Sequence, residues 1–234
     1  MLTVEALKKE AGITACKDVK NGMKLGLGTG STVKYTIIEI ARRVSEEGLE
    51  IVGVPTSEST KDLAESLNIP LIDIEHAGKL DLTIDGADEF DSNYDLIKGG
   101  GGALTREKIV ALASESMIVV ADDSKKVPIL GQFPLPVEVN MNHWEFVKNE
   151  IIKLCSVEIN LRGGQHDPFI TDNKGYILDC NFGPTIDNPG ELEIMINSIK
   201  GVVQVGLFVG ICDIVIISSS SGTETLVNPN GRLI

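Results

Sequence analysis

Four consecutive glycines at residues 99–102 constrain the fold of this chain more than any other feature. Lys98 and a short apolar segment precede them, and a helix-forming stretch that contains Glu107 follows. Each glycine costs about 0.5–1 kcal/mol more to order than an alanine, so four in a row between a strand and a helix need a reason. The pattern indicates backbone held close to a ligand, with amide N–H groups facing it at the start of a helix. The alternative is a flexible linker, which the lack of serine and of a charge run disfavours.

Glu107 lies on an unexpected side of the helix that we expect over residues 103–117. At about 100° per residue it falls between Val110 and Ala111, opposite the polar side of that helix. A carboxylate on the side that faces the protein is paired, buried at a cost, or needed for function. Arg106 lies toward the same side, so a structural salt bridge is the alternative interpretation.

The charge balance restricts the partners of the protein. The 234 residues include 21 Lys and Arg against 34 Asp and Glu, which gives a formal net charge of −13. This excess of negative charge argues against nucleic acid and against an anionic membrane surface. A small anionic substrate is compatible with it, provided that a few cations and backbone amides form a local positive pocket.

Membrane segments, metals and nucleotide cofactors are not expected. No apolar run approaches the ~20 residues of a membrane span, and the N-terminal segment is a charged amphipathic helix without a signal-peptide core. The four cysteines and three histidines have no metal-ligand spacing. Ser31 stands where a dinucleotide-binding fingerprint starting at Gly26 would have its third glycine. We therefore predict a soluble, cytoplasmic protein with free, mostly buried thiols, no metal and no cofactor.

Strands and helices alternate through the first half of the chain, which is typical of a parallel α/β sheet. After residue 126 the strands become short and hairpin-like, which indicates a small α+β domain. We expect an α/β domain of residues 1–128 and 207–234 and a small domain of residues 129–206, with strands at 201–208 and 213–218 returning to the first sheet. The other expected strands cover residues 23–27, 51–55, 71–74, 80–85, 117–121, 157–161, 168–171 and 175–179.

Polar motifs follow several of the expected strands. Residues 28–32, Gly-Thr-Gly-Ser-Thr, bring hydroxyls and amides to a strand-to-helix junction, which suits a phosphate monoester. A tight turn capped by Ser31 or Thr32 is the alternative. Residues 85–89 put three acids at the end of a buried strand, where open α/β sheets bind ligands, although a surface cluster or a divalent-metal site are alternatives. Lys98 and Lys125 each follow a strand and are expected at the same edge, unless they are ordinary solvated lysines.

Taken in order, these segments resemble the A-type ribose-5-phosphate isomerases. The resemblance includes residues 28–32, 85–89, 98–108, 124–125, 133–139 and 201–208, and extends from about residue 7 to residue 226. It departs from the family mainly at residues 163–189 and after residue 209. It implies a Rossmann-like, mostly parallel sheet with helices on both faces, a small ferredoxin-like α+β domain, and a cytoplasmic homodimer or homotetramer.

The resemblance also implies a reaction, the interconversion of D-ribose 5-phosphate and D-ribulose 5-phosphate in the non-oxidative branch of the pentose phosphate pathway, without cofactor or metal. Glu107 would be the base that moves a proton between C2 and C1 through an enediolate, a step that suits a desolvated carboxylate with a raised pKa. Lys98 and the glycine amides would stabilise the enediolate. Asp85 and Asp88 would bind sugar hydroxyls and assist ring opening. The implied substrate-binding residues are Thr29, Gly30, Ser31, Thr32, Asp85, Gly86, Ala87, Asp88, Lys98, Gly99, Gly100, Gly101 and Lys125.

Two other classes of protein share parts of this pattern. A sugar-phosphate sensor would keep the phosphate loop without needing Glu107 or Lys98, and would usually carry a DNA-binding segment, which the sequence does not suggest. A coenzyme A transferase on a related fold would use its glutamate covalently, in an exchange reaction. Conversion of ribose 5-phosphate to a ketose by the protein alone distinguishes the isomerase from both.

Overall fold

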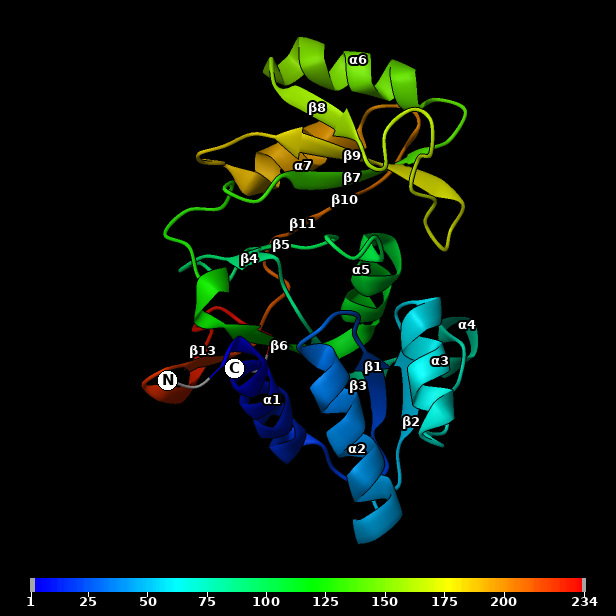
Figure 1. Ribbon diagram of the computed structural model, residues 1–234, viewed down its shortest axis with the longest axis vertical. Helices are drawn as coiled ribbons and strands as arrows, with labels where there is room; N and C mark the ends of the chain where they lie inside the picture. Colours follow the sequence, from blue (N-terminus) through cyan, green and yellow to red (C-terminus); the bar gives the residue numbers. More distant parts are fainter. Residues whose placement is uncertain (1–2, 233–234) are drawn as a thin grey trace. The chain divides into compact units, whose positions relative to one another are not determined.

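A six-stranded sheet in the order β13-β12-β6-β3-β1-β2 is the largest sheet of the computed structural model, which describes residues 3–232 (Figure 1). All neighbouring strands in it are parallel except β13, which pairs antiparallel with β12. The predicted α/β class with a mostly parallel sheet is therefore confirmed. The six strands are β1 (Lys24–Leu27), β2 (Val52–Pro55), β3 (Leu80–Asp85), β6 (Ser114–Asp122), β12 (Ile214–Ser219) and β13 (Gly222–Val227).

Helices cover both faces of this sheet. The helices α1 and α2 lie side by side on one face, where Leu25 and Leu82 join them in one apolar core (Figure 1). Strand residues alternate between faces, so Gly26 and Thr83 turn to the other side, where they meet Val110 of α5. No helix within residues 3–232 is both long and apolar enough to span a membrane. The helices are α1 (Val4–Ala15), α2 (Val33–Glu47), α3 (Glu58–Ser66), α4 (Ile74–Ala77) and α5 (Leu104–Ala113), with short 3-10 turns at η1 (Cys16–Asp18) and η2 (Asp123–Lys125).

The direction of α5 is opposite to that of the strands it covers. Its last residue, Ala113, is followed directly by Ser114, which begins β6 at the amino edge of the sheet. Val110, three residues before the end of α5, contacts Gly26 in the middle of β1. Because a helix rises about 1.5 Å per residue, the first turn of α5 lies toward the carboxyl ends of the strands.

A second group of elements has a ferredoxin-like arrangement. Its antiparallel sheet has the order β10-β7-β9-β8, and its chain order is strand, helix, strand, strand, helix, strand. Val147 of α6 and Ile196 of α7 share one apolar core with Val137 and Leu178 of the sheet. A three-stranded sheet, β11-β5-β4, belongs to the same group. These elements are β4 (Glu89–Phe90), β5 (Leu96–Ile97), β7 (Leu135–Asn140), α6 (Trp144–Cys155), β8 (Glu158–Leu161), β9 (Gly175–Asn181), α7 (Pro189–Asn197), β10 (Val202–Val205) and β11 (Leu207–Phe208).

Internal contacts divide the chain into two units. The first unit contains the six-stranded sheet and comprises the chain up to Ala87, Arg106–Lys126 and the part from Gly210 onward. The second unit comprises Asp88–Thr105 and Val127–Val209. This division groups residues 88–105 with the smaller sheets, whereas we expected them in the α/β domain. The domain boundaries 1–128 with 207–234 and 129–206 stay a prediction.

Three expected strands differ in the structure. Residues 71–74 contribute one bridge, from Leu71 to Gly53, before α4 begins at Ile74. Residues 168–171 likewise form only a bridge, through Ile170. Residues 201–208 form two strands that pair with β7 and β5, so the prediction that they return to the six-stranded sheet is wrong. The two strands, β10 and β11, are separated by Gly206. A Cβ atom added to Gly206 would lie 2.3 Å from the carbonyl oxygen of Lys98. Short apolar runs do not reveal their partners, which is why the pattern misled here.

Candidate functional site

Strands β1 and β3 mark the point where the connections of the six-stranded sheet reverse direction. The chain leaves β1 toward β2 on one side and leaves β3 toward β6 on the other. Open α/β sheets bind their ligands outside the carboxyl ends of the strands at such a point. Residues 28–32 follow β1 and Asp85 ends β3, so two of the predicted motifs lie there.

Asp85 holds the loop that follows β1. The residue is fully buried, and its Oδ1 accepts hydrogen bonds from the amides of Thr29 at 3.1 Å and Gly86 at 2.7 Å. The loop approaches so closely that a Cβ atom added to Gly28 would lie 2.2 Å from the same oxygen. Asp85 is therefore fixed by backbone donors, and the 28–32 loop is fixed by Asp85.

Hydroxyl groups of the connection from β2 to α3 support the 28–32 loop from another side. Thr29 Oγ1 lies 2.7 Å from Thr56 Oγ1 and 2.8 Å from Ser57 Oγ. Thr60 Oγ1 donates to the carbonyl of Gly28 at 2.8 Å. Thr32 precedes the first turn of α2, and its side chain makes no capping hydrogen bond there, so the alternative of a turn capped by Thr32 is wrong. The amides at the start of a 15-residue helix form a favourable place for an anion.

Glu107 lies in the first turn of α5 and is only 4% exposed. It precedes Val110 by one turn, so it lies toward the carboxyl ends of the strands. The neighbouring Arg106 forms an ion pair with the carboxylate of Glu58 at 2.7 Å. The position expected from the helical pattern, with Glu107 on the side facing the protein, is confirmed.

Lys125 lies at the same edge of the sheet as Asp85. It belongs to η2, which follows β6 directly, and β6 is the parallel neighbour of β3. The side chain is half-buried, which is less exposed than an ordinary surface lysine. The first unit therefore brings Lys125, two buried carboxylates (Asp85 and Glu107) and the 28–32 loop toward one edge of its sheet.

The glycine run of the second unit is a hydrogen-bonded loop rather than a linker. The amide of Gly100 donates to the carboxylate of Asp88 at 2.7 Å, and the amide of Asp88 donates to the carbonyl of Ile97 at 2.8 Å. Gly99 and Gly102 have φ angles of 109° and 80°, which glycine adopts without strain, and the amide of Gly102 returns to the carbonyl of Gly99 at 2.9 Å. Asp88 and the glycine loop are thus held together by hydrogen bonds, a contact that the sequence did not reveal.

Lys98 is a buried lysine at the start of this loop. Only 2% of it is exposed, and its Nζ lies 5.5 Å from the centre of the Phe208 ring. Its amide donates to the carbonyl of Gly206 at 2.8 Å, which ties β5 to the end of β10. Because the side chain is buried, the alternative of a solvated surface lysine is wrong for Lys98. Burial of an ammonium group is costly, and a contact with an aromatic ring offsets part of this cost.

Comparison with known proteins decides the family. The family model of ribose 5-phosphate isomerase A (phosphoriboisomerase A) matches residues 52–222. Ribose-5-phosphate isomerase A of Cereibacter sphaeroides is 47% identical over 229 residues, which cover 95% of this chain and 91% of the relative. This chain belongs to the ribose 5-phosphate isomerase A family. The resemblance stated from the motifs is therefore confirmed.

Solved structures of ribose 5-phosphate isomerases agree with the fold. A D-ribose-5-phosphate isomerase in complex with phospho-erythronic acid superimposes with a TM-score of 0.93 at 40% identity, covering 97% of this chain and 100% of that one. The ribose 5-phosphate isomerase A of Methanocaldococcus jannaschii gives a TM-score of 0.90 at 40% identity, covering 96% and 100%. The fold of the isomerase A family therefore applies to nearly the whole chain.

Several residues that contact the 28–32 loop were not among the residues predicted from the sequence. Lys8 of α1 donates to Ser31 Oγ at 2.9 Å and so brings an ammonium group to the 28–32 loop, although nothing in the pattern of α1 distinguishes this lysine. The hydroxyls of residues 56–60 were visible as a polar cluster after a buried strand, which is the signal that could have found them. Glu89, the third acid of residues 85–89, accepts hydrogen bonds from the amides of Gly131 and Phe133 and is structural. Within residues 3–232, no three His, Cys, Asp or Glu side chains group as metal ligands.

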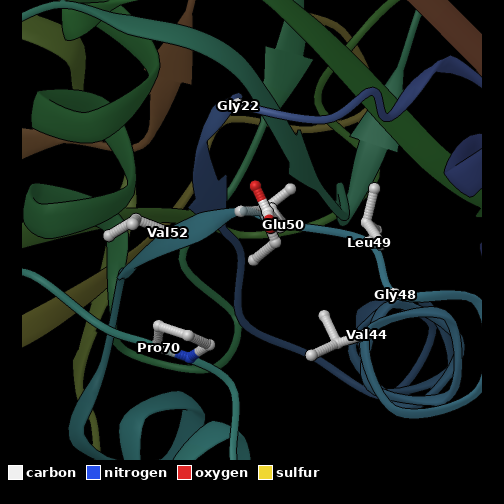
Figure 2. A pocket seen from close by; sticks show the side chains of 8 residues that line it. Gly22, Val44, Gly48, Leu49, Glu50, Val52 and Pro70 are labelled. Atoms are coloured by element: carbon white, nitrogen blue, oxygen red, sulfur yellow. The ribbon is translucent and has the colours of Figure 1, made fainter.

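A cavity of about 530 Å³ lies beside the amino end of β2 (Figure 2). Most of its lining residues belong to α2 or to the segments that lead into β1 and β2, whereas residues 28–32, Asp85 and Lys125 lie at or beyond the carboxyl ends of strands. None of the predicted site residues is among the described residues that line this cavity. The lining consists of Gly22, Val44, Gly48, Leu49, Glu50, Ile51, Val52 and Pro70.

Proposed function

We propose that this chain interconverts D-ribose 5-phosphate and D-ribulose 5-phosphate through an enediolate, with Glu107 as the general base. Membership in the ribose 5-phosphate isomerase A family supplies the reaction class. The observation that supports the mechanism is the burial of Glu107 in the first turn of α5, toward the ligand-binding edge of the sheet. A carboxylate withdrawn from water is a better base toward a weakly acidic C–H group than an exposed one.

The phosphate of the substrate is proposed to bind the 28–32 loop. Amides and hydroxyls of Thr29, Gly30, Ser31 and Thr32 would surround it at the N-terminus of α2, where the helix dipole favours an anion. Lys125, together with Lys8, would supply the positive charge that a chain of net charge −13 needs locally. This cationic contribution explains how a strongly acidic protein binds an acidic substrate.

The remaining groups are proposed to act on the sugar. Glu107 would take the C2 proton of the open-chain aldose and return it to C1, while Lys98 and the amides of residues 99–101 stabilise the oxygen charge of the enediolate. Asp85 and Asp88 would bind hydroxyl groups together with the backbone of Gly86 and Ala87. They would also assist ring opening and transfer of the hydroxyl protons.

The setting of the enzyme is proposed from the same family resemblance. It would work in the cytoplasm, in the non-oxidative branch of the pentose phosphate pathway, as a homodimer or homotetramer. It would need neither a metal nor a nucleotide cofactor, because every step is a proton transfer between carbon or oxygen atoms and protein groups.

Substitution of Glu107 by glutamine tests the proposed base. Glu107→Gln keeps the shape of the side chain but cannot accept a proton, and general base catalysis supplies about 10²–10⁴-fold. We expect kcat for ribose 5-phosphate to fall by at least about 10²-fold with little change in KM. In D₂O, incorporation of deuterium into substrate and product should slow in parallel.

Glu115→Gln is the matched control. Glu115 is also a glutamate of the first unit, but it is exposed and pairs with Lys79 at the surface, so this variant should keep wild-type turnover. A Glu107→Gln enzyme with turnover equal to the control would exclude Glu107 as the base. The base would then have to be sought at Asp85 or Asp88.

A further inference from the structure

Arg162 connects the ferredoxin-like sheet to the glycine loop. It follows β8, and its side chain is 18% exposed. Its Nε and Nη2 donate to the carboxylate of Asp179 in β9 at 3.0 and 2.5 Å, the two-pronged geometry that only a guanidinium provides. Its Nη1 donates to the carbonyl of Gly99 at 2.8 Å and to that of Gly100 at 3.1 Å.

The guanidinium of Arg162 is held in place from several sides. It lies 5.8 Å from the centre of the Phe169 ring. The same ring lies against Gly102, where an added Cβ atom would come within 2.5 Å of it. The backbone of Arg162 is itself fixed, since its amide donates to the carbonyl of Ile177 at 2.9 Å. A planar group restrained in this way orients whatever it binds.

One peptide group lies between Arg162 and Asp88. The carbonyl of Gly99 and the amide of Gly100 belong to the same planar trans peptide, so they point in opposite directions. The carbonyl accepts from Arg162, and the amide donates to Asp88 Oδ2 at 2.7 Å. A rotation of this peptide would break both bonds at once. The guanidinium therefore determines the direction of the amide that holds the Asp88 carboxylate.

We propose that Arg162 is a positioning residue of the isomerase reaction. Through the peptide between Gly99 and Gly100 it fixes the carboxylate of Asp88, and through the carbonyl of Gly100 it turns the amide of Gly101 to the opposite side. Asp179 and Phe169 keep the guanidinium in the required orientation. This inference rests on the proposed role of Asp88 and goes beyond it, because it assigns a function to a residue outside the implied substrate-binding set. The simpler interpretation is that Arg162 and Asp179 form a salt bridge that only stabilises the small sheet.

A double-mutant cycle distinguishes the two interpretations. In Arg162→Gln the peptide loses its charged donor, and misplacement of a catalytic group by about 1 Å costs on the order of 10²-fold in rate. We expect kcat to fall by about this factor, with a smaller change in KM. If Arg162 acts through Asp88, adding Arg162→Gln to Asp88→Asn should lower kcat little further, since coupled residues are not additive. Lys153→Gln, which breaks the exposed pair with Glu150 in α6, should leave kcat unchanged.

Asp179→Asn provides a second variant that keeps the arginine. It weakens the clamp on Arg162, so kcat should fall less than in Arg162→Gln, and this loss should also disappear in the Asp88→Asn background. In enzyme labelled with ¹⁵N-glycine, hydrogen exchange at the Gly100 amide should be faster in Arg162→Gln than in wild type. If the salt bridge only stabilised the small sheet, its loss would lower Tm but would change neither kcat nor the exchange rate of the Gly100 amide.

Each remaining outcome overturns a definite statement. Wild-type kcat in Arg162→Gln, alongside a reduced kcat in Asp88→Asn, refutes the positioning role of Arg162 and leaves the role of Asp88 intact. Fully multiplicative losses in the double variant refute the connection through Asp88. Wild-type kcat in Asp88→Asn refutes the proposed role of Asp88 itself, and the inference with it.

Discussion

At the scale of single residues, the site depends on close approach between a backbone and a carboxylate. The Cα of Gly28 stands where a side chain would collide with Asp85 Oδ1, and the amides of Thr29 and Gly86 donate to the same oxygen. Gly28 is not one of the glycines with a positive φ angle. Glycine is therefore required here because there is no room for a side chain, and not because of the backbone conformation. Gly28 thus leaves the room that the carboxylate of Asp85 needs.

Gly28→Ala should therefore impair activity and stability together. The new Cβ atom would lie 2.2 Å from Asp85 Oδ1, and overpacking of this kind costs about 1–3 kcal/mol. We expect a lower Tm and at least about a tenfold loss of kcat/KM, because displacement of the Asp85 carboxylate would lower the reaction rate. Gly190→Ala in α7, where the nearest atom is 3.7 Å away, is the control and should keep both values. Full activity in Gly28→Ala would show that the position of Asp85 tolerates the shift.

At the scale of elements, Arg232 ties the end of the described chain to the sheet and to α5. Its guanidinium donates to the carboxylate of Asp213, which is 1% exposed, and to the carbonyls of Ala111, Ser114 and Ile211. Asp213 also accepts from the amide of Met117 at 2.7 Å, at the beginning of the parallel pairing of β6 with β12. One ion pair thereby joins the C-terminal strands to the helix that carries Glu107.

Arg232→Met should destabilise the first unit. The substitution leaves the buried carboxylate of Asp213 without its guanidinium. Because the side chain of Arg232 is 31% exposed and Asp213 keeps two backbone donors, the cost should lie at or below the low end of the range for a fully buried pair, about 3–5 kcal/mol. For a chain of this length that corresponds to a fall in Tm of at most roughly 10 °C, measured by calorimetry. Arg42→Met is the matched control, because Arg42 pairs with three glutamates at the surface, where ion pairs contribute at most about 1 kcal/mol. Equal shifts in the two variants would contradict the structural role of Arg232.

At the scale of the whole molecule, each unit has its own apolar core and each core contains a buried cysteine. Cys16 belongs to the core of the first unit and Cys180 to that of the second. Burial raises the pKa of Cys16 to about 12, and it also raises the pKa of Cys180. Cys155, the last residue of α6, is half-buried, and burial raises its pKa as well.

The thiols should react in the order of their burial. The thiolate is the reactive form, so at pH 8 a thiol whose pKa is near 12 stays protonated and inert, quite apart from being inaccessible. We expect a disulfide reagent to modify Cys155 first in the native protein, and Cys16 and Cys180 only after denaturant unfolds their cores, as followed by mass spectrometry of peptides. Labelling of Cys16 as fast as Cys155 under native conditions would show that the core of the first unit opens readily.

The sequence alone determined the α/β class, the family and the candidate residues, because these depend on local patterns. Glycines, hydroxyls and acids at the ends of apolar segments are visible without knowing what those segments pair with. The helical position of Glu107 follows from periodicity within a single helix, and the buried environment of Asp85 follows from its place at the end of a buried strand. The order of the motifs along the chain then sufficed to indicate the isomerase family.

Tertiary structure decided which segments are neighbours. Only the folded chain shows that β3 lies between β6 and β1, that residues 202–208 serve two sheets, and that 71–74 yields no strand. The same holds for Lys8 at Ser31 and for Arg162 at Gly99 and Gly100, which lie 23 to 63 residues apart in sequence. Hydrogen bonds of this range depend on how sheets and helices stack, and periodicity within a segment carries no record of that stacking.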